Sequence, residues 1–388
     1  MSLAAGPLLV VWTEFPPRTG GIQVHGAEFC RHLAGSGIPF RVLTWAPTAE
    51  TERRECAAFD AQADFRIDRV LPRGDFPAAL AECARAEACL APVAVYSSQI
   101  ALAPAFRSPV VCRTAGNDFL RPWVGPAEVS PEGLEINRAH CRQAASRCAA
   151  IVCNSRWTAA RLEEFAPGTV AHVLSGGVDT ERFFPVPKAE ARRVLGWNAE
   201  VPVVMAAARH VLKKGLDLAI LASRDWPDAR LVLLGTGPET AALMRMARES
   251  GVEHRTDFPG MIPHHAMPLY LNAADIVVFP SREAFDPGRH AVDYETMGRL
   301  PCEAMACGTY VVAADTGGVG EIVEDGVTGT LVPPGGVEAL AGAVRAVLLN
   351  GRLRRERTEA ARQRAVSQFS FDRINSATLR ILDAAVRQ

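Results

Sequence analysis

The sequence predicts an α/β protein of two domains, each built around a parallel sheet that helices cover. Its 388 residues exceed what one hydrophobic core usually holds. Short apolar runs of strand length alternate with helical segments along the chain, and this order is typical of parallel sheets. Hydrophobic residues make up 48% of the chain, which is enough for two packed cores. We expect domains over residues 1–185 and 186–369, followed by a helix over 370–388.

The composition argues against several classes of protein. A net charge of -1 gives no basic footprint of a nucleic-acid binder. The ten cysteines show neither CxxC pairs nor the spacing of a zinc site, so we expect reduced thiols in the core. Apolar runs stay shorter than the ~18 residues of a membrane span. We therefore expect a soluble, cytoplasmic protein, and peripheral contact with a membrane stays open.

The first element is a strand over Leu8–Thr13, and helical periodicity begins at Ile22. The loop between them ends in Gly20 and Gly21. Ligands of parallel sheets bind beyond the carboxyl ends of the strands, where glycine leaves room for a phosphate. A bare Gly-Gly is more often only a turn, so both interpretations stay open.

Residues 46–92 are rich in Ala, Arg and Glu and predict helices without a motif. Strands follow at Val93–Tyr96 and Val110–Cys112, and the second of these leads into a polar cluster that ends in Asn117 and Asp118. Such a cluster at a strand end is a plausible element of a functional site. The alternative is an Asx turn or a helix cap. The proline-rich residues 119–136 predict an irregular segment that lines an acceptor cleft or serves as scaffold.

The second domain opens with a strand over Val201–Ala207, directly followed by the loop Arg209–Gly215. A guanidinium fork at Arg209 and a point charge at Lys214 suit the binding of a diphosphate. The alternative is two solvated cations on a turn. Lys213 is expected to face water.

The segment Glu295–Gly308 carries two carboxylates that bracket seven residues. Gly298 can bend the backbone and Gly308 suits a helix end, so a short helix is expected to begin just after Gly298. Its free amides favour phosphate oxygens. Eight positions at ~1.5 Å rise span roughly 12 Å, which lets Glu295 and Glu303 accept hydroxyls of two sugars across a phosphate. The alternative is a surface helix whose glutamates face water.

This Glu-x7-Glu spacing, with Ala-Met-Ala-Cys-Gly after it and Arg-x4-Lys-Gly before it, resembles the signature of GT4-type retaining glycosyltransferases of GT-B fold. The resemblance implies two Rossmann-like domains that face each other across a cleft, the first for the acceptor and the second for a nucleotide sugar, with the last helix crossing back to the first. It places Glu295 on the donor hexose, Glu303 on the ribose, and Arg209 with Lys214 on the diphosphate. The other donor-binding residues that it implies are Gly20, Gly21, Gly235, Met297, Gly298 and Arg299.

The chain departs from the family pattern in two places. Ala115 stands where many relatives carry a histidine near the donor hexose. The resemblance therefore makes Asn117 and Asp118 the substitute candidates for contact with the sugar or the acceptor. About a dozen residues, Arg282–Tyr294, intervene before Glu295. Glu283 is a rival first glutamate, but only Glu295 keeps the seven-residue gap. For the inserted residues Asp286, His290 and Asp293, two interpretations stay open. They flank the donor sugar or the acceptor, or they belong to the edge of a mobile lid or to solvent-exposed surface.

The function that the resemblance implies is retaining transfer of a hexosyl unit from a nucleoside-diphosphate sugar to a hydroxyl of a small molecule or glycan. A UDP-sugar is favoured as donor, and neither a metal nor a cofactor is expected, since the cations neutralise the leaving diphosphate. The rivals are a nucleotide-sugar 2-epimerase, a non-catalytic sugar-nucleotide sensor and, remotely, a nicotinamide dehydrogenase, whose GxGxxG fingerprint is missing. The base, the hexose, the acceptor and the oligomeric state stay open.

Overall fold

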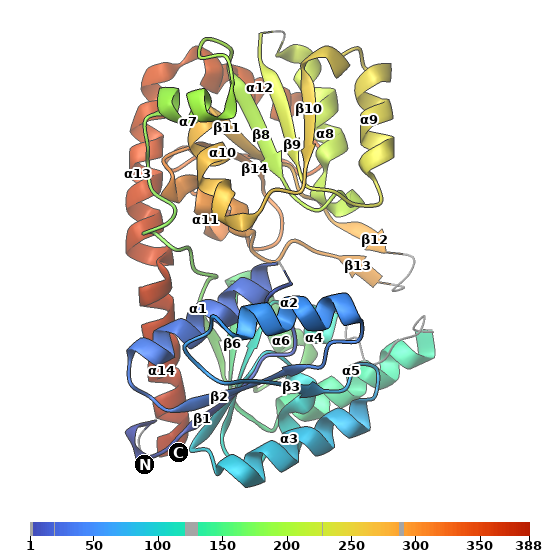
Figure 1. The fold of residues 1–388 in the computed structure, drawn as a ribbon. Coiled ribbons are helices and arrows are strands. Elements are labelled where there is room, and N and C mark those ends of the chain that lie inside the picture. Colours follow the sequence, from blue (N-terminus) through green and yellow to red (C-terminus); the bar gives the residue numbers. More distant parts are fainter. Residues whose placement is uncertain (1–2, 19, 121–130, 227, 287–290) are drawn as a thin grey trace. The chain divides into compact units, whose positions relative to one another are not determined.

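The protein divides into two compact units, which are visible in the computed structural model (Figure 1). The structure describes all residues except 1–2, 19, 121–130, 227 and 287–290. The first unit comprises Met1–Gly176, Phe285–Val292 and Phe371–Gln388. The second unit comprises Gly177–Ala284 and Asp293–Ser370.

The division falls at Gly176, ahead of the boundary predicted at residue 185. The residues at the predicted boundary belong to the second unit, where Asn272 binds the backbone on both sides of Pro185. Its side-chain amide donates to the carbonyl of Phe184 at 3.0 Å, and its side-chain oxygen accepts from the backbone N–H of Val186 at 2.8 Å.

The first unit contains a seven-stranded parallel sheet in the order β3-β2-β1-β4-β5-β6-β7. The strands are β1 Leu8–Val11, β2 Phe40–Trp45, β3 Ile67–Leu71, β4 Ala94–Ser97, β5 Val110–Thr114, β6 Cys148–Cys153 and β7 Ala171–Val173. The strand order reverses between β1 and β4. At such a switch point the loops diverge to opposite faces and leave room for a ligand at the carboxyl edge.

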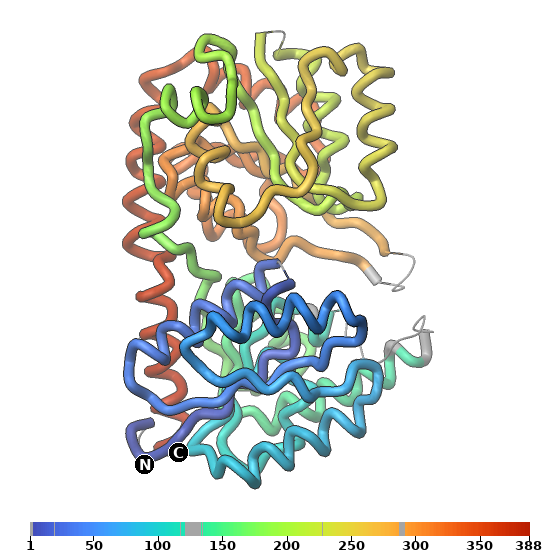
Figure 2. The backbone as a smooth tube through the Cα atoms, viewed as in Figure 1, coloured from blue at the N-terminus to red at the C-terminus, as the bar shows by residue number. Residues whose placement is uncertain are grey.

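Helices cover both faces of this sheet (Figure 1). They are α1 Gly21–Gly35, α2 Glu50–Asp60, α3 Phe76–Leu90, α4 Asn117–Leu120, α5 Pro131–Ala145, α6 Arg156–Phe165 and α14 Phe371–Arg387, with the 3-10 turns η1 Leu3–Ala5 and η2 Ile100–Ala105. The last helix, α14, packs against α1 and the strands β4 to β6. Its Asp383 accepts from the backbone N–H of Leu3 at 3.0 Å, which brings the two ends of the chain side by side (Figure 2).

The second unit contains a six-stranded parallel sheet in the order β10-β9-β8-β11-β14-β15. The strands are β8 Val203–Ala207, β9 Arg230–Leu234, β10 Thr256–Gly260, β11 Ile276–Phe279, β14 Tyr310–Ala314 and β15 Thr330–Val332. The order reverses between β8 and β11, so this unit has a switch point too. A separate pair of short strands, β12 Ala284–Asp286 and β13 Ala291–Asp293, lies within the insertion.

The helices of the second unit again lie on both faces of the sheet (Figure 1). They are α7 Lys188–Leu195, α8 Leu216–Ala222, α9 Thr240–Glu249, α10 Met267–Ala273, α11 Arg299–Ala306, α12 Val337–Leu349 and α13 Gly351–Phe369. Shorter 3-10 turns are η3 Leu212–Lys214, η4 Ser223–Asp225, η5 Glu253–Arg255, η6 His264–Ala266 and η8 Val319–Glu321.

Each central strand contributes side chains to two hydrophobic cores, one on either face of its sheet. In β8, Val203 and Met205 pack into the core on one face, while Val204 and Ala206 pack into the core on the other. A strand buried on both faces gives a continuous apolar run rather than an alternating one, which is why these strands are readable in the sequence.

The prediction of helices throughout residues 46–92 is wrong at β3. This edge strand carries Asp68 and Arg69 in its middle and so lacks the apolar run. Asp68 forms an ion pair with Arg41 of the neighbouring strand β2, and Arg69 pairs with Asp60 at 2.8 Å. A cross-strand charge pair with β2 and an ion pair with the end of α2 replace apolar packing at this edge.

All ten cysteines are free thiols and most are buried. Burial raises the pKa of Cys83 to about 12, with a smaller contribution from Glu82. Such thiols stay protonated at neutral pH and act as small apolar side chains. Across the described residues, no helix is both long enough and apolar enough to span a bilayer.

Candidate active site

The loops that follow β8 and β11 meet at the switch point of the second unit. The loop after β8 contains Arg209 and ends in η3 and Lys214, and the chain after β11 begins with Ser281. Pro280 stands between β11 and Ser281, and its carbonyl lies against Gly215 at the end of the first loop. Both loops lie at the carboxyl edge of the sheet, where open α/β sheets bind ligands. The sequence interpretation placed the diphosphate site in this region.

Lys214 and Glu295 are joined in an ion pair at this edge. The Lys214 ammonium donates to Oε2 of Glu295, and the Ser281 hydroxyl donates to the same oxygen at 3.3 Å. The ammonium also lies 5.2 Å from the centre of the Phe279 ring. No residue of the described chain donates to the other oxygen, Oε1. Glu295 is thus anchored through one oxygen and can accept a hydroxyl with the other.

The charge of Glu295 is maintained by its neighbours. Burial acts to raise the pKa of this carboxyl, but the charges of Lys214 and Lys213 and the hydrogen bonds from Lys214 and Ser281 outweigh it and leave the pKa below its usual value. Glu295 therefore remains an acceptor at neutral pH.

Close backbone packing places Glu295 beside Lys214. Gly317, at a φ of +55°, lies against the Glu295 carbonyl, and a Cβ on residue 317 would stand 1.7 Å from that oxygen. The neighbouring Gly318 N–H donates to the same carbonyl at 3.4 Å. Only glycine allows this approach, so the loop after β14 fixes the backbone that carries the catalytic candidate.

Glu303 occupies the first turns of α11 and is 6% exposed. The helix begins at Arg299, directly after Gly298, as predicted. Oε1 of Glu303 accepts from Arg299 at 2.6 Å and lies 3.0 Å from Nε2 of His264. Burial acts to raise the pKa of Glu303, but Arg299 and the hydrogen bond with His264 hold it below its usual value.

Glu295 and Glu303 are held in the same way, each through only one of its two carboxylate oxygens. No residue of the described chain donates to Oε2 of Glu303, just as none reaches Oε1 of Glu295. Each group is charged, buried and fixed through one oxygen. Two such groups on one unit can grip two sets of hydroxyls, whereas freely rotating surface glutamates could not, so the surface interpretation of both glutamates is wrong.

The basic residues of the loop after β8 differ in their exposure and in their contacts. The Arg209 side chain is exposed and forms neither an ion pair nor a hydrogen bond with the described part of the chain. Lys213 was expected to face water, and this expectation is wrong. Its ammonium donates to Asp293 at 2.8 Å and to the carbonyl of Tyr294 at 3.3 Å, because the inserted segment returns against this loop.

The remaining donor-binding candidates of this unit occupy three settings. Gly235, at a φ of +115°, touches the loop after β8, since a Cβ there would stand 2.0 Å from the carbonyl of Ala208. Met297 packs its side chain in the core, so this side chain does not line the site. Arg299 binds Glu303 and orients it. These residues hold the backbone and the side chains of the site in place, and the contacts described here are with the protein.

The candidates of the first unit lie near its own switch point. Gly20 precedes α1 and Gly21 is its first residue, so the amides of this 15-residue helix begin at the glycine pair. Asn117 begins α4, and its side chain lies outside the described residues. Asp118 is 6% exposed, and its Oδ2 has no hydrogen-bond partner in the described chain. Its burial favours a structural role over contact with a sugar.

Asp118 predicts a pH dependence of stability. Burial raises its pKa to about 7, against opposing hydrogen bonds from Thr114 and the backbone of Ile100. The folded chain then holds a proton that the unfolded chain has released, so the free energy of unfolding should fall as pH rises from about 4 to about 7, by on the order of 1.4 kcal/mol for each unit of the shift. Urea unfolding at several pH values should show this contribution as the difference in slope between the parent and Asp118→Asn, because the lowered pKa values of Glu52, Glu295 and Glu303 act in the opposite direction in both proteins. An unchanged slope in the variant would contradict the prediction.

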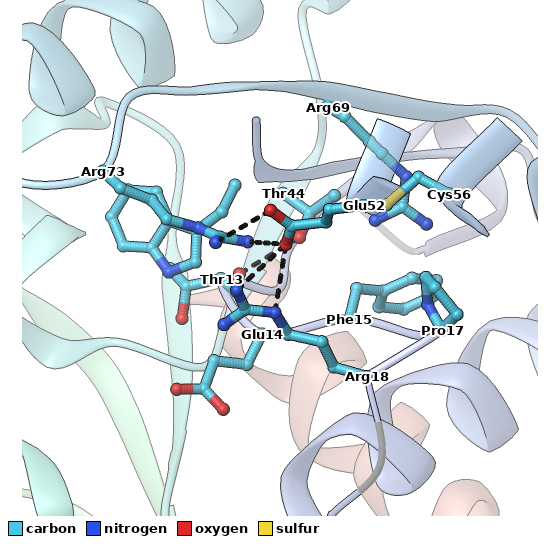
Figure 3. A pocket seen from close by; sticks show the side chains of 11 residues that line it. Thr13, Glu14, Phe15, Pro17, Arg18, Thr44, Glu52, Cys56, Arg69 and Arg73 are labelled. Atoms are coloured by element: carbon cyan, nitrogen blue, oxygen red, sulfur yellow. Dashed lines mark hydrogen bonds and ion pairs between the residues drawn. The ribbon is translucent and has the colours of Figure 1, made fainter. Parts of the chain in front are cut away.

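Glu52 organises the loop that leads to Gly20. It lies in a pocket of the first unit and accepts from Arg73 at 2.7 Å and Arg18 at 3.0 Å (Figure 3). Burial acts to raise its pKa, but the hydrogen bonds from Thr48 and Arg73 and the nearby arginines bring it down to about 2. The carboxylate is therefore charged at any working pH and ties Arg18, which stands just before the glycine pair, to the sheet edge.

The insertion contains the strands β12 and β13 rather than an unstructured loop. Of the residues expected to flank a substrate, Asp293 pairs with Lys213 and His290 lies outside the described residues. The rival glutamate, Glu283, is exposed, whereas Glu295 is buried at the site. The choice of Glu295 is therefore supported.

Sequence reasoning missed Ser281 and His264, which bind the two carboxylates. Both follow strands of the second unit at the carboxyl edge, Ser281 after β11 and His264 after β10. Position after a strand was the available signal, but neither residue belongs to the quoted motif. Among the described residues, no group of three His, Cys, Asp or Glu side chains could hold a metal ion.

Comparison with known proteins identifies this architecture as the GT-B fold of glycosyltransferases. Sucrose-phosphate synthase from Thermosynechococcus elongatus superimposes with a TM-score of 0.79, covering 97% of this chain and 98% of that one at 20% identity. Anabaena HepE, solved in complex with UDP-glucose, gives a TM-score of 0.76 over 98% of this chain and 100% of its own, at 21% identity. The predicted fold class is confirmed.

The chain belongs to glycosyltransferase family 4. The pattern described as Glycosyltransferase Family 4 matches residues 19–182, and that of Glycosyl transferases group 1 matches residues 187–364. The GDP-mannose-dependent alpha-(1-6)-phosphatidylinositol monomannoside mannosyltransferase of Mycolicibacterium smegmatis is 30% identical over 89% of this chain and 90% of its own. A monoacylated-substrate counterpart from Corynebacterium glutamicum is 29% identical over 99% and 100%. The chain is thus a glycosyltransferase.

Proposed function

We propose that this enzyme transfers a hexosyl unit from a nucleoside-diphosphate sugar to a hydroxyl acceptor, with retention at the anomeric carbon and without a metal. The observation that carries the proposal is the pair of half-anchored carboxylates: Glu295, which is paired with Lys214 at the switch point, and Glu303 on α11. Acceptors for two sets of hydroxyls and a cation for the phosphates between them match the chemistry of such a donor.

In this proposal Glu295 accepts from the hexose and Glu303 from the ribose. Lys214 and the exposed Arg209 bind the diphosphate and stabilise its charge as the glycosidic bond breaks. These cations take the part of a metal. The leaving phosphate oxygen accepts the proton of the acceptor hydroxyl on the same face of the sugar, so no carboxylate acts as nucleophile.

GDP-mannose is the donor that we propose first. The relatives that span nearly the whole chain are named as GDP-mannose-dependent, whereas the UDP complexes belong to proteins of about one-fifth identity. The UDP-sugar favoured from sequence remains the second choice. A phosphatidylinositol mannoside is the first acceptor to test, since those relatives act on one.

The test is a transfer assay with the purified chain and a panel of GDP, UDP and ADP sugars. We expect GDP release from GDP-mannose that depends on an acceptor, an α-linked product by NMR, and a rate that EDTA leaves unchanged. An isomerised donor in the absence of acceptor would instead identify a 2-epimerase. Donor binding in thermal-shift assays without transfer to any acceptor would identify a sensor, and an inverted product would overturn retention.

A further inference from the structure

The inserted segment 282–294 leaves and rejoins the sheet edge at one place. At its start, the backbone N–H of Arg282 donates to the carbonyl of Lys213 at 2.8 Å, and the Arg282 side chain pairs with Asp217 of α8 at 2.7 Å. At its end, Asp293 and the carbonyl of Tyr294 both accept from the Lys213 ammonium. Lys213 therefore contacts both ends of the insertion, one through its backbone and the other through its side chain.

The contact at the end of the insertion stands directly beside the active-site pair. Lys213 and Lys214 are consecutive, and Asp293 precedes Glu295 by two residues. Two ion pairs, Lys213 with Asp293 and Lys214 with Glu295, thus join the same two segments. A shift of the Lys213 pair would move the backbone that carries Glu295.

The ammonium of Lys213 is held by two acceptors of the insertion, Asp293 and the carbonyl of Tyr294, whereas that of Lys214 is held by one, Glu295. The Lys213 side chain is 19% exposed and that of Asp293 is 17% exposed. Burial lowers the pKa of the Lys213 ammonium, and nearby Lys214 acts in the same direction, while Glu295 and Asp293 oppose them. In such a partly dehydrated setting, an ion pair holds its geometry better than one in open solvent.

We propose that Lys213 is a positioning residue that, through Asp293 and Tyr294, closes the insertion onto the loop after β8 and so delivers Glu295 to Lys214. This inference rests on the proposed function. Residues 282–294 separate Ser281 from Glu295 in the chain, and the loop-closure cost of such a connection grows only slowly with its length. The Lys213 contacts hold the two ends of the insertion together, and the hydrogen bond from Ser281 to Glu295 is retained across it.

The test compares Lys213→Met with the parent in the transfer assay. Because a misplacement of about 1 Å can cost ~100-fold in rate, we expect kcat to fall about 10- to 100-fold, with little change in the KM for the donor. Lys213→Arg should recover much of the loss. Asp293→Asn, a smaller change, should lower kcat in the same way, and the double variant should lose no more than the larger single loss.

Asp217→Asn is the matched control, because it breaks the other ion pair at the base of the insertion without touching Glu295 or its neighbours. It should keep the parent kcat. Parent-like kcat in both Lys213→Met and Asp293→Asn, or losses that multiply in the double variant, would overturn the inference. Absence of transfer in the parent chain would show up before any substitution and would count against the proposed function instead.

Discussion

Replacing Lys214 with alanine is expected to lower kcat for sugar transfer about 100- to 1000-fold, or about 3–4 kcal/mol, as is typical when one preorganised electrostatic donor is removed. The Lys214 ammonium is held by Glu295 and lies over the Phe279 ring, so its position is fixed before any donor arrives. Charge on the diphosphate grows as the glycosidic bond breaks. The interaction is therefore strongest in the transition state, and kcat should fall more than the donor affinity.

Lys214→Ala also removes the cation that pairs with Glu295. The fall in kcat therefore has two possible sources, the lost contact with the diphosphate and the altered Glu295, and these need to be separated. The background Glu295→Gln separates them. If Lys214 acted only through Glu295, its removal from that background would cost nothing further. We expect a further loss of at least tenfold, because the diphosphate would lose its cation as well. Arg352→Ala, which breaks an exposed ion pair with Glu356 in the same unit, is the control and should leave kcat unchanged. Parent-like turnover in Lys214→Ala would remove the assignment.

The sequence predicted those parts of the site that depend on local patterns. Gly298, followed by residues that favour a helix, predicted the start of α11. The apolar run Val203–Ala207 indicated the strand that precedes the Arg209 loop. Both rest on short-range physics, namely the conformational freedom of glycine and burial on two faces of a sheet.

Partners brought together by the tertiary fold were not predictable. Nothing near Lys213 in the sequence indicates that Asp293, 80 positions away, neutralises it. His264 approaches Glu303 only because β10 and α11 are both placed by the sheet. Met297 lies in the motif, but its side chain faces the core. A motif identifies which residues recur together, whereas burial and pairing decide which of their atoms remain for a ligand.

Glu303→Gln is expected to raise the KM for the donor about 10- to 100-fold, because hydrogen bonds to a charged group contribute roughly 1.5–3 kcal/mol. Its effect on kcat should be much smaller, since the ribose lies away from the breaking bond and is held equally in the ground and transition states. The amide keeps the shape of the side chain but loses the charge that Arg299 and His264 support. Glu338→Gln, at an exposed position of α12, is the matched control and should behave as the parent.

A donor that lacks the ribose 2′-hydroxyl tests the same contact from the ligand side. The parent enzyme should bind the 2′-deoxy donor more weakly than the natural one, whereas Glu303→Gln should barely distinguish the two, because the hydroxyl and the carboxylate contribute through one shared hydrogen bond. If both enzymes showed the same discrimination, Glu303 would not contact the ribose, and its buried pairing with Arg299 would serve only to hold α11 in place. The unfolding midpoint of the variant, measured alongside, distinguishes a lost ligand contact from a loosened helix.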